Sequence, residues 1–282
     1  MNAGHVALAL ALLLTACGGR SESGRGEGEL GFVPTTNVEE GKVLLPVTFP
    51  DATSAELVYP PGLEIAELGV FPYTSGTLHG KSSTPGRSDF VARDFVIRYG
   101  HLEKMLEVWN KGRSPRLLAQ YEGVDAQAVG LWDLGWDDTA HKLGFQFGRW
   151  TVLVYDYVAA GAMSDAERAT WAASFSGRET ADGFLLLEAS GPLRLARVGE
   201  HAGPELTFSA AEPTRKLILN PGECRPHRDQ TLRIDGKLVQ WNGGFATWCL
   251  SDSMGIHAEG SRDFIGALIR ELEVRKVTIA KS

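Results

Sequence analysis

The sequence is poor in charged residues and in cysteine, and it has no apolar run long enough to span a bilayer. Charged side chains make up 22% of the 282 residues, and there are three cysteines. No stretch reaches the ~18 consecutive apolar residues of a transmembrane helix. Lys and Arg number 28 against 35 Asp and Glu, which gives a formal charge of −7. Because nucleic acids bind clustered basic side chains, this acidic balance argues against nucleic acid as a partner.

Short motifs for catalysis and cofactor binding are missing too. The chain has no G-x-S-x-G, S-x-x-K, H-E-x-x-H or G-x-x-x-x-G-K-[ST] motif, and no G-x-G-x-x-G follows an expected strand. We therefore expect no cofactor and no metal, and we favour a non-catalytic protein. A catalytic set assembled from distant residues would leave no such trace, so an enzymatic role stays open.

The most specific sequence feature is an apolar segment that ends in a cysteine. Residues 6–16, VALALALLLTA, have the length of a signal-peptide core, and Cys17 follows at once. The junction at 14–17, Leu-Thr-Ala-Cys, resembles the lipobox of bacterial lipoprotein precursors. Residues 1–5 contain no Lys or Arg, which departs from the positive segment that usually precedes such a core. The alternative is a buried apolar helix with an incidental cysteine.

The resemblance implies a maturation step and a location. Residues 1–16 would be removed as a signal peptide, and Cys17 would carry the lipid that anchors the protein at the extracytoplasmic face of the cell membrane. Residues 17–37 would form the lipidated cysteine and a flexible tether, because most of this segment is rich in Gly, Ser and charge. A globular body follows over 38–282, with a break near residue 160 if it has two lobes.

The body has the pattern of an α+β fold, with mostly antiparallel sheet and about two helices. Asp235-Gly236 predicts a hairpin turn, and the last strand is expected near 274–280. Further strand is expected in the aromatic stretch 128–158. Apolar, β-branched and aromatic runs predict other strands at 43–49, 55–60, 89–99, 184–190, 205–210, 215–220 and 245–250.

Helical signals occur in two further segments. Ser164 and Glu167 form a capping-box pattern ahead of a helix over 166–175. A second helix is expected from 261 to 273, where the apolar residues lie on one stripe. Residues 101–110 fit either a strand or a short helix.

The cysteine count bears on both redox state and metal binding. If Cys17 is lipidated, Cys224 and Cys249 remain, and an extracytoplasmic compartment favours their oxidation. We expect them to form a disulfide that links neighbouring strands. With His227 and His257 the two thiols also make a ligand set for tetrahedral zinc, and free thiols are a third interpretation.

An aromatic and acidic cluster is the first candidate binding site. Trp132, Asp133, Trp136, Asp137 and Asp138 fall within seven residues. Indoles stack on sugar rings and carboxylates accept hydroxyl hydrogens, so the cluster predicts a carbohydrate-binding edge or, with paired carboxylates, a glycosidase site. The alternative is a strand end with core tryptophans and a solvated acidic turn.

A basic cluster beside the first disulfide cysteine is the second candidate. Arg225, His227 and Arg228 could bind an anion such as phosphate or carboxylate, with Arg as a bidentate donor. The alternative is an exposed loop held by the disulfide.

Residues 251–257 hold the side-chain types of a catalytic triad. Ser251, Asp252, Ser253 and His257 lie within seven residues, but triads are defined in space and the spacing fixes no geometry. We favour a turn in which Asp252 or Ser253 bonds the backbone, and we assign no catalytic residue.

These features together predict a membrane-anchored lipoprotein with a non-catalytic binding or scaffolding role at the cell envelope. Its expected partners are the membrane, through Cys17, and a carbohydrate or an envelope protein. One alternative is an envelope glycan hydrolase that uses carboxylates near Asp133 and Asp137. The other is a purely structural envelope component.

Overall fold

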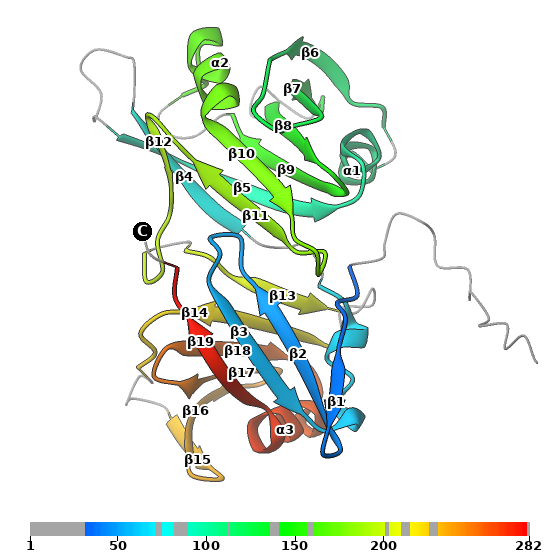
Figure 1. Ribbon diagram of the computed structural model, residues 1–282, viewed down its shortest axis with the longest axis vertical. Helices are drawn as coiled ribbons and strands as arrows, with labels where there is room; N and C mark the ends of the chain where they lie inside the picture. Colours follow the sequence, from blue (N-terminus) through cyan, green and yellow to red (C-terminus); the bar gives the residue numbers. More distant parts are fainter. Residues whose placement is uncertain are drawn as a thin grey trace, which may run out of the picture.

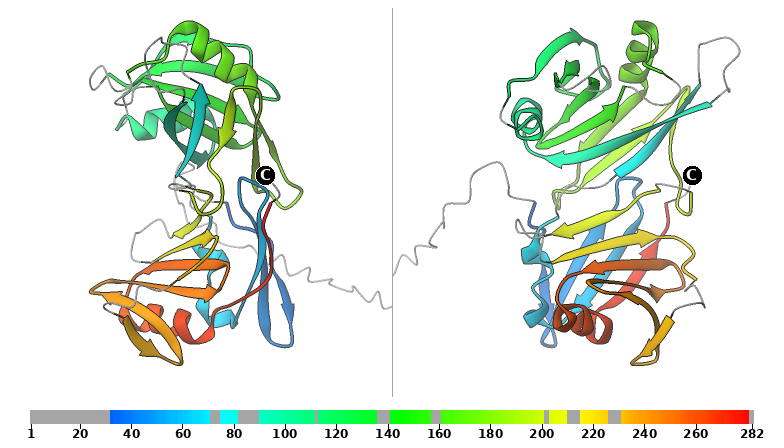
Figure 2. Two further views of the ribbon diagram at one scale, coloured as in Figure 1. Left: turned by 90° about the vertical axis from the view of Figure 1, so that its left-hand side faces the viewer. Right: turned by 180° about the vertical axis from the view of Figure 1, so that it is seen from behind.

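The chain folds into two lobes that are stacked along the long axis of the molecule (Figure 1), and Figure 2 shows the same two lobes from the side and from behind. The computed structural model describes residues 32–70, 75–81, 90–111, 113–135, 141–156, 161–200, 203–209, 215–225 and 231–280.

The lower lobe is built from the two parts of the chain that flank the upper lobe. One sheet has the order β1-β2-β3-β19, and the other has the order β13-β14-β18-β17-β16-β15. The first strands are β1 (Asn37–Glu39), β2 (Lys42–Thr48) and β3 (Ser54–Tyr59), followed by short 3-10 helices η1 (Pro61–Leu63) and η2 (Ala66–Leu68). The later elements are β13 (Leu206–Ser209), β14 (Lys216–Pro221), β15 (Thr231–Ile234), β16 (Lys237–Asn242), β17 (Phe245–Ser251), β18 (Met254–Glu259), α3 (Arg262–Glu271) and β19 (Glu273–Thr278).

The upper lobe contains the intervening chain. Its large sheet has the order β12-β4-β5-β9-β8-β7-β6, and β10 pairs with β11 in a separate hairpin. The strands are β4 (Ser75–Lys81), β5 (Phe90–Tyr99), β6 (Arg116–Gln120), β7 (Ala128–Asp133), β8 (His141–Phe147), β9 (Trp150–Tyr155), β10 (Phe175–Glu179), β11 (Leu185–Ala189) and β12 (Leu193–Leu195). The helices are α1 (Leu102–Trp109) and α2 (Asp165–Ser174).

The predicted class is confirmed, although the number of helices was set too low. Every strand pair in the sheets of the described residues is antiparallel. Three α-helices are present among the described residues, because the ambiguous segment 101–110 contains α1. Leu102, Met105 and Leu106 of α1 are buried, which is the one-sided pattern of a surface helix.

Local sequence signals for turns and caps are confirmed. The backbone N–H of Glu167 donates to Ser164 Oγ, and the Glu167 carboxylate accepts the Ser164 N–H at 2.7 Å, which completes the capping box of α2. Asp235 and Gly236 have φ values of 46° and 81°, as a two-residue hairpin turn requires. This turn joins β15 to β16.

The boundary between the lobes differs from the expected one. A break near residue 160 would fall inside the upper lobe, between β9 and α2 (Figure 1). The chain instead passes between the lobes after Val70 and before Leu206. Val70 forms isolated bridges with Phe32 and Phe208 at this junction.

Phe32 belongs to the folded body, which therefore begins before the predicted residue 38. The residue is 9% exposed, and the centroid of its ring lies 5.2 Å from that of Phe184 and 6.0 Å from that of Trp150. Its carbonyl accepts the N–H of Val70 at 2.6 Å. Aromatic packing of this kind holds the start of the body against the upper lobe.

The two lobes share a hydrophobic core. One apolar cluster contains residues of both, including Leu57 and Leu217 below and Phe145 and Phe147 above. The turn after β2 also reaches the upper lobe, where the Pro50 carbonyl accepts the N–H of Leu187 at 2.7 Å. Across the described parts of the chain, no helix combines the length and the apolar character needed to cross a membrane.

Helix α2 is attached to the upper sheet by a buried ion pair. Asp156 is fully buried, and Arg168 donates to it through Nη2 at 2.9 Å and Nε at 3.2 Å. Burial alone would lower the pKa of Arg168, but hydrogen bonds to Asp156 and Asp165 raise it above its ordinary value. Arg168 therefore stays charged and neutralises a carboxylate that has no access to water.

Candidate functional site

Cys224 and Cys249 form the predicted disulfide, with their Cα atoms 5.6 Å apart. Cys224 follows β14 and Cys249 lies in β17, and the sheet order places β18 between these strands. The bridge therefore crosses one strand instead of linking neighbours as expected. Gly255 of β18 lies beneath it, where a Cβ would be 3.4 Å from Cys224 Sγ.

The zinc interpretation is wrong, because the disulfide consumes the two thiolates that zinc would need. His257 has other partners, and His227 lies outside the described residues. Among the residues that the structure describes, no group of three or more His, Cys, Asp or Glu side chains is placed to hold a metal.

The basic cluster is only partly described. Arg225 forms an ion pair with Glu223, and both side chains are exposed. His227 and Arg228 lie outside the described residues. A depression of about 370 Å³ beside Arg225 is lined by Glu200, Glu205 and Glu223, so the described part offers more carboxylates than guanidinium groups. This balance does not favour an anion site.

His257 takes part in a cross-strand network and not in a group with Ser251. Its Nδ1 lies 3.2 Å from Thr247 Oγ1, and its Nε2 lies 3.1 Å from Glu259 Oε1. Burial would raise the pKa of Glu259, but hydrogen bonds from His257 and Lys216 outweigh it, and the pKa lies below its ordinary value. Both ring nitrogens are thus engaged across β17 and β18.

The start of the same segment forms a turn, but the side chain that bonds the backbone belongs to Ser251 and not to the expected Asp252 or Ser253. Ser251 Oγ accepts the backbone N–H of Ser253 at 3.3 Å and lies 3.4 Å from Ser253 Oγ. The Asp252 carbonyl accepts the N–H of Cys224 at 3.0 Å, which ties the turn to the disulfide. Bonds of this kind satisfy the backbone at the β17–β18 connection.

The aromatic and acidic cluster is also described in part, since Trp136, Asp137 and Asp138 lie outside the described residues. Trp132 is 8% exposed and packs under α1, so it offers no ring face for stacking on a sugar. Asp133 accepts hydrogen bonds from Arg116 at 2.8 Å and from the Gly135 N–H at 2.7 Å. Both bonds hold the pKa of Asp133 below its ordinary range, which is the reverse of a glycosidase general acid.

A groove of about 410 Å³ lies at this end of the upper lobe, between α1 and the edge strand β6. Figure 1 shows both elements beside β7 and β8. Ala128, Gly130 and Trp132 of β7 line it, as do exposed polar side chains from three other segments. Those polar side chains are His101, Glu103, Gln120 and Gln127.

Gln146 holds in place the start of α1, which forms one wall of this groove. Its Oε1 accepts the N–H of Leu102 at 2.5 Å, and its Nε2 donates to the carbonyls of Gly148 at 2.7 Å and Trp150 at 3.1 Å. The amide is buried, and each of its two ends is hydrogen-bonded. The first turn of α1 is therefore held at a fixed height above the sheet.

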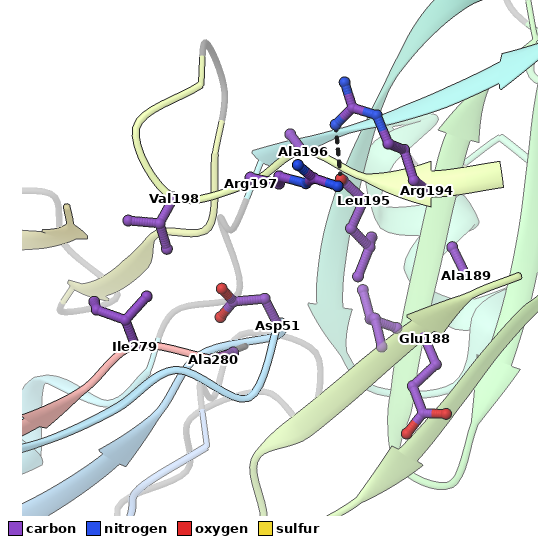
Figure 3. Close-up of a pocket in the computed structure, with 11 residues that line it drawn as sticks. Asp51, Glu188, Ala189, Arg194, Leu195, Ala196, Arg197, Val198, Ile279 and Ala280 are labelled. Atoms are coloured by element: carbon purple, nitrogen blue, oxygen red, sulfur yellow. Dashed lines mark hydrogen bonds between the residues drawn. The ribbon is translucent and has the colours of Figure 1, made fainter. Parts of the chain in front are cut away.

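A larger cleft of about 540 Å³ lies between the lobes (Figure 3). Asp51 contributes from below, while Glu188, Arg194 and Arg197 contribute from above. Figure 3 shows that Glu188 and Arg194 point away from Asp51. Both Asp51 oxygens accept hydrogen bonds from Thr53 at 2.9 Å, and Arg194 pairs with Glu200 at 2.7 Å.

The groove is the better candidate site, although the cleft is larger. Binding sites depend on a few convergent polar groups, and the charged side chains of the cleft do not converge. In the groove, by contrast, the indole Nε1 of Trp132 is buried and has no hydrogen-bond partner. Sequence reasoning singled out Trp132 but missed His101, Gln120 and Gln127.

The chain matches no protein-family model, no curated protein and no solved structure. Its function must therefore be argued from its own residues.

Proposed function

We propose that the protein is a lipid-anchored, extracytoplasmic binding protein of the cell envelope. The observation that carries this proposal is the use of the three cysteines. One stands in the lipobox-like junction at 14–17, and the other two form a disulfide. Disulfides persist in oxidising compartments outside the cytoplasm, which is where a lipobox directs a protein.

A binding role fits the described site better than catalysis. The groove at Trp132 has donors and acceptors on its rim, whereas the carboxylate of Asp133 is committed to Arg116 and Gly135. A glycan hydrolase needs a second carboxyl group that faces the same glycosidic bond. One of the two groups has a raised pKa and acts as the general acid. Asp137 and Asp138, the other carboxylates of the predicted hydrolase, lie outside the described residues, so the proposal rests on the groove.

The Cys17→Ala variant is expected to move from the membrane fraction to the soluble fraction. The variant lacks the thiol that would accept the lipid, and the proposal gives the body no second anchor once residues 1–16 are removed. The measurement is fractionation of cells with an alkaline wash, together with incorporation of radiolabelled palmitate.

Cys249→Ser is the matched control, because it removes a different cysteine and should leave both readouts unchanged. Membrane retention or label incorporation in Cys17→Ala at the wild-type level would contradict the anchor.

Photo-crosslinking from Gln120 in native membranes tests the binding role separately. A binding protein should give a crosslinked product that saturates, whereas a purely structural protein would give no saturable product.

A further inference from the structure

The groove on the upper lobe ends at a buried donor that has no acceptor. Trp132 lines the groove and is 8% exposed, and its Nε1 has no hydrogen-bond partner. Native structures pair nearly all buried donors, so an orphaned one calls for an explanation. Its position at the edge of a groove indicates that a ligand atom supplies the acceptor.

The floor of the groove shows how a ligand reaches this nitrogen. A Cβ on Gly130 would lie 3.0 Å from Trp132 Nε1 and 2.7 Å from Leu117 Cδ1. The indole nitrogen and the Leu117 methyl group therefore both lie over the bare backbone of Gly130. Leu117 is 39% exposed and sits at an irregularity in the edge strand β6. A ligand can displace this side chain without disturbing the core.

The rim of the groove specifies the charge and polarity of the ligand. Gln120 and Gln127 present amides, which both donate and accept hydrogen bonds. Glu103 carries the one full charge among the described lining residues, and it is negative. An anionic ligand would meet this carboxylate, so the rim favours a neutral ligand with several hydroxyl groups.

We propose that the groove binds an acetamido sugar, whose amide carbonyl accepts the Nε1–H of Trp132 once the ligand has displaced the side chain of Leu117. The sugar hydroxyls bind Gln120, Gln127 and Glu103. The groove volume of about 410 Å³ lies within the range of small-ligand sites. The inference rests on the proposed function, because an extracytoplasmic binding protein meets such glycans. A peptide carries the same amide but lacks the hydroxyls that this rim binds.

The detergent-solubilised full chain is expected to bind N,N′-diacetylchitobiose and to bind cellobiose, which has hydroxyls in place of the acetamido groups, much more weakly. Trp132→Phe removes the N–H and should weaken diacetylchitobiose binding about tenfold, as the loss of one buried hydrogen bond predicts. Leu117→Ala uncovers the nitrogen and should tighten binding several-fold. Isothermal titration measures the affinities, and the indole ¹⁵N–H resonance of Trp132 should shift downfield on binding.

Trp248→Phe is the matched control, because Trp248 Nε1 is the other orphaned indole among the described residues, is buried in the core of the lower lobe, and should not affect binding. Equal affinity for the two disaccharides, or an unchanged affinity in Trp132→Phe, would overturn the inference. Tighter binding of acetyl-trialanine amide than of diacetylchitobiose would replace the sugar with a peptide. The Cys17 fractionation is independent of these titrations, so a failed anchor and a failed sugar site give different results.

Discussion

The Arg168→Met variant is expected to lose about 3–5 kcal/mol of unfolding free energy, because it leaves the buried carboxylate of Asp156 without its partner. Arg168 supplies two of the hydrogen bonds to this carboxylate, and the N–H of Met163 supplies a weaker third at 3.3 Å. One backbone N–H cannot replace the two charge-assisted hydrogen bonds of the guanidinium group. Urea denaturation followed by circular dichroism measures the loss.

Arg116→Met is the matched control for the same substitution. Arg116 donates to Asp133 at 2.8 Å, but its side chain is 74% exposed. Exposed pairs contribute at most about 1 kcal/mol, so this variant should unfold near the wild-type midpoint. Similar losses in both variants would contradict the role assigned to the buried pair. The double variant Asp156→Leu with Arg168→Met should recover part of the loss, because neither member of the pair is left buried without its partner.

Removal of the disulfide by Cys224→Ser with Cys249→Ser is expected to cost about 3.5 kcal/mol of stability in the chain-entropy model. The bridge joins residues 25 positions apart, so it restricts a sizeable loop in the unfolded chain. It also holds the segment after β14 across β18. Denaturation curves with and without reductant give the difference.

Reductant should lower the wild-type midpoint to that of the double variant and leave the variant itself unchanged. Thiol titration of the unfolded chain supplies a second measurement: with Cys17→Ala, no thiol should react before reduction and two should react after it. A wild-type midpoint that does not respond to reductant would contradict a stabilising bridge.

The sequence predicted the structure correctly where that structure depends on residues close together in the chain. The cap of α2 needs only Ser164 and Glu167, and the β15–β16 turn needs only Asp235 and Gly236, whose backbone tolerates positive φ. Helix α1 was ambiguous because its eight residues sit among extended segments, and its helical state depends on packing over the sheet.

Strands whose partners are distant were harder to predict. β4 contains Gly80, where a Cβ would lie 2.5 Å from the Trp171 ring. The glycine is therefore required by the packing of α2, which comes some ninety residues later in the chain. β6 is an exposed edge strand and lacks an alternating pattern. These contacts exist only in the folded chain.

The candidate site was predictable only at its centre. Trp132 stood out for its aromatic ring, but the groove brings it together with α1, β6 and the loop before β7. The one local hint was Gly130 inside a strand, because glycine there often marks a close approach. The burial of the Trp132 indole beneath α1 was not visible in the spacing, and the other indole of the predicted surface, Trp136, lies outside the described residues.

The discontinuous lower lobe has a consequence for the order of folding. β3 pairs with β2 and also with β19, so its sheet joins residues separated by about two hundred positions. The upper lobe can complete its large sheet while the chain is still emerging, but the lower one must wait for its last strand. Pairing over such separations raises contact order and slows folding. Until β19 is synthesised, one edge of β3 has no partner strand, and unpaired edges of this kind are prone to aggregation.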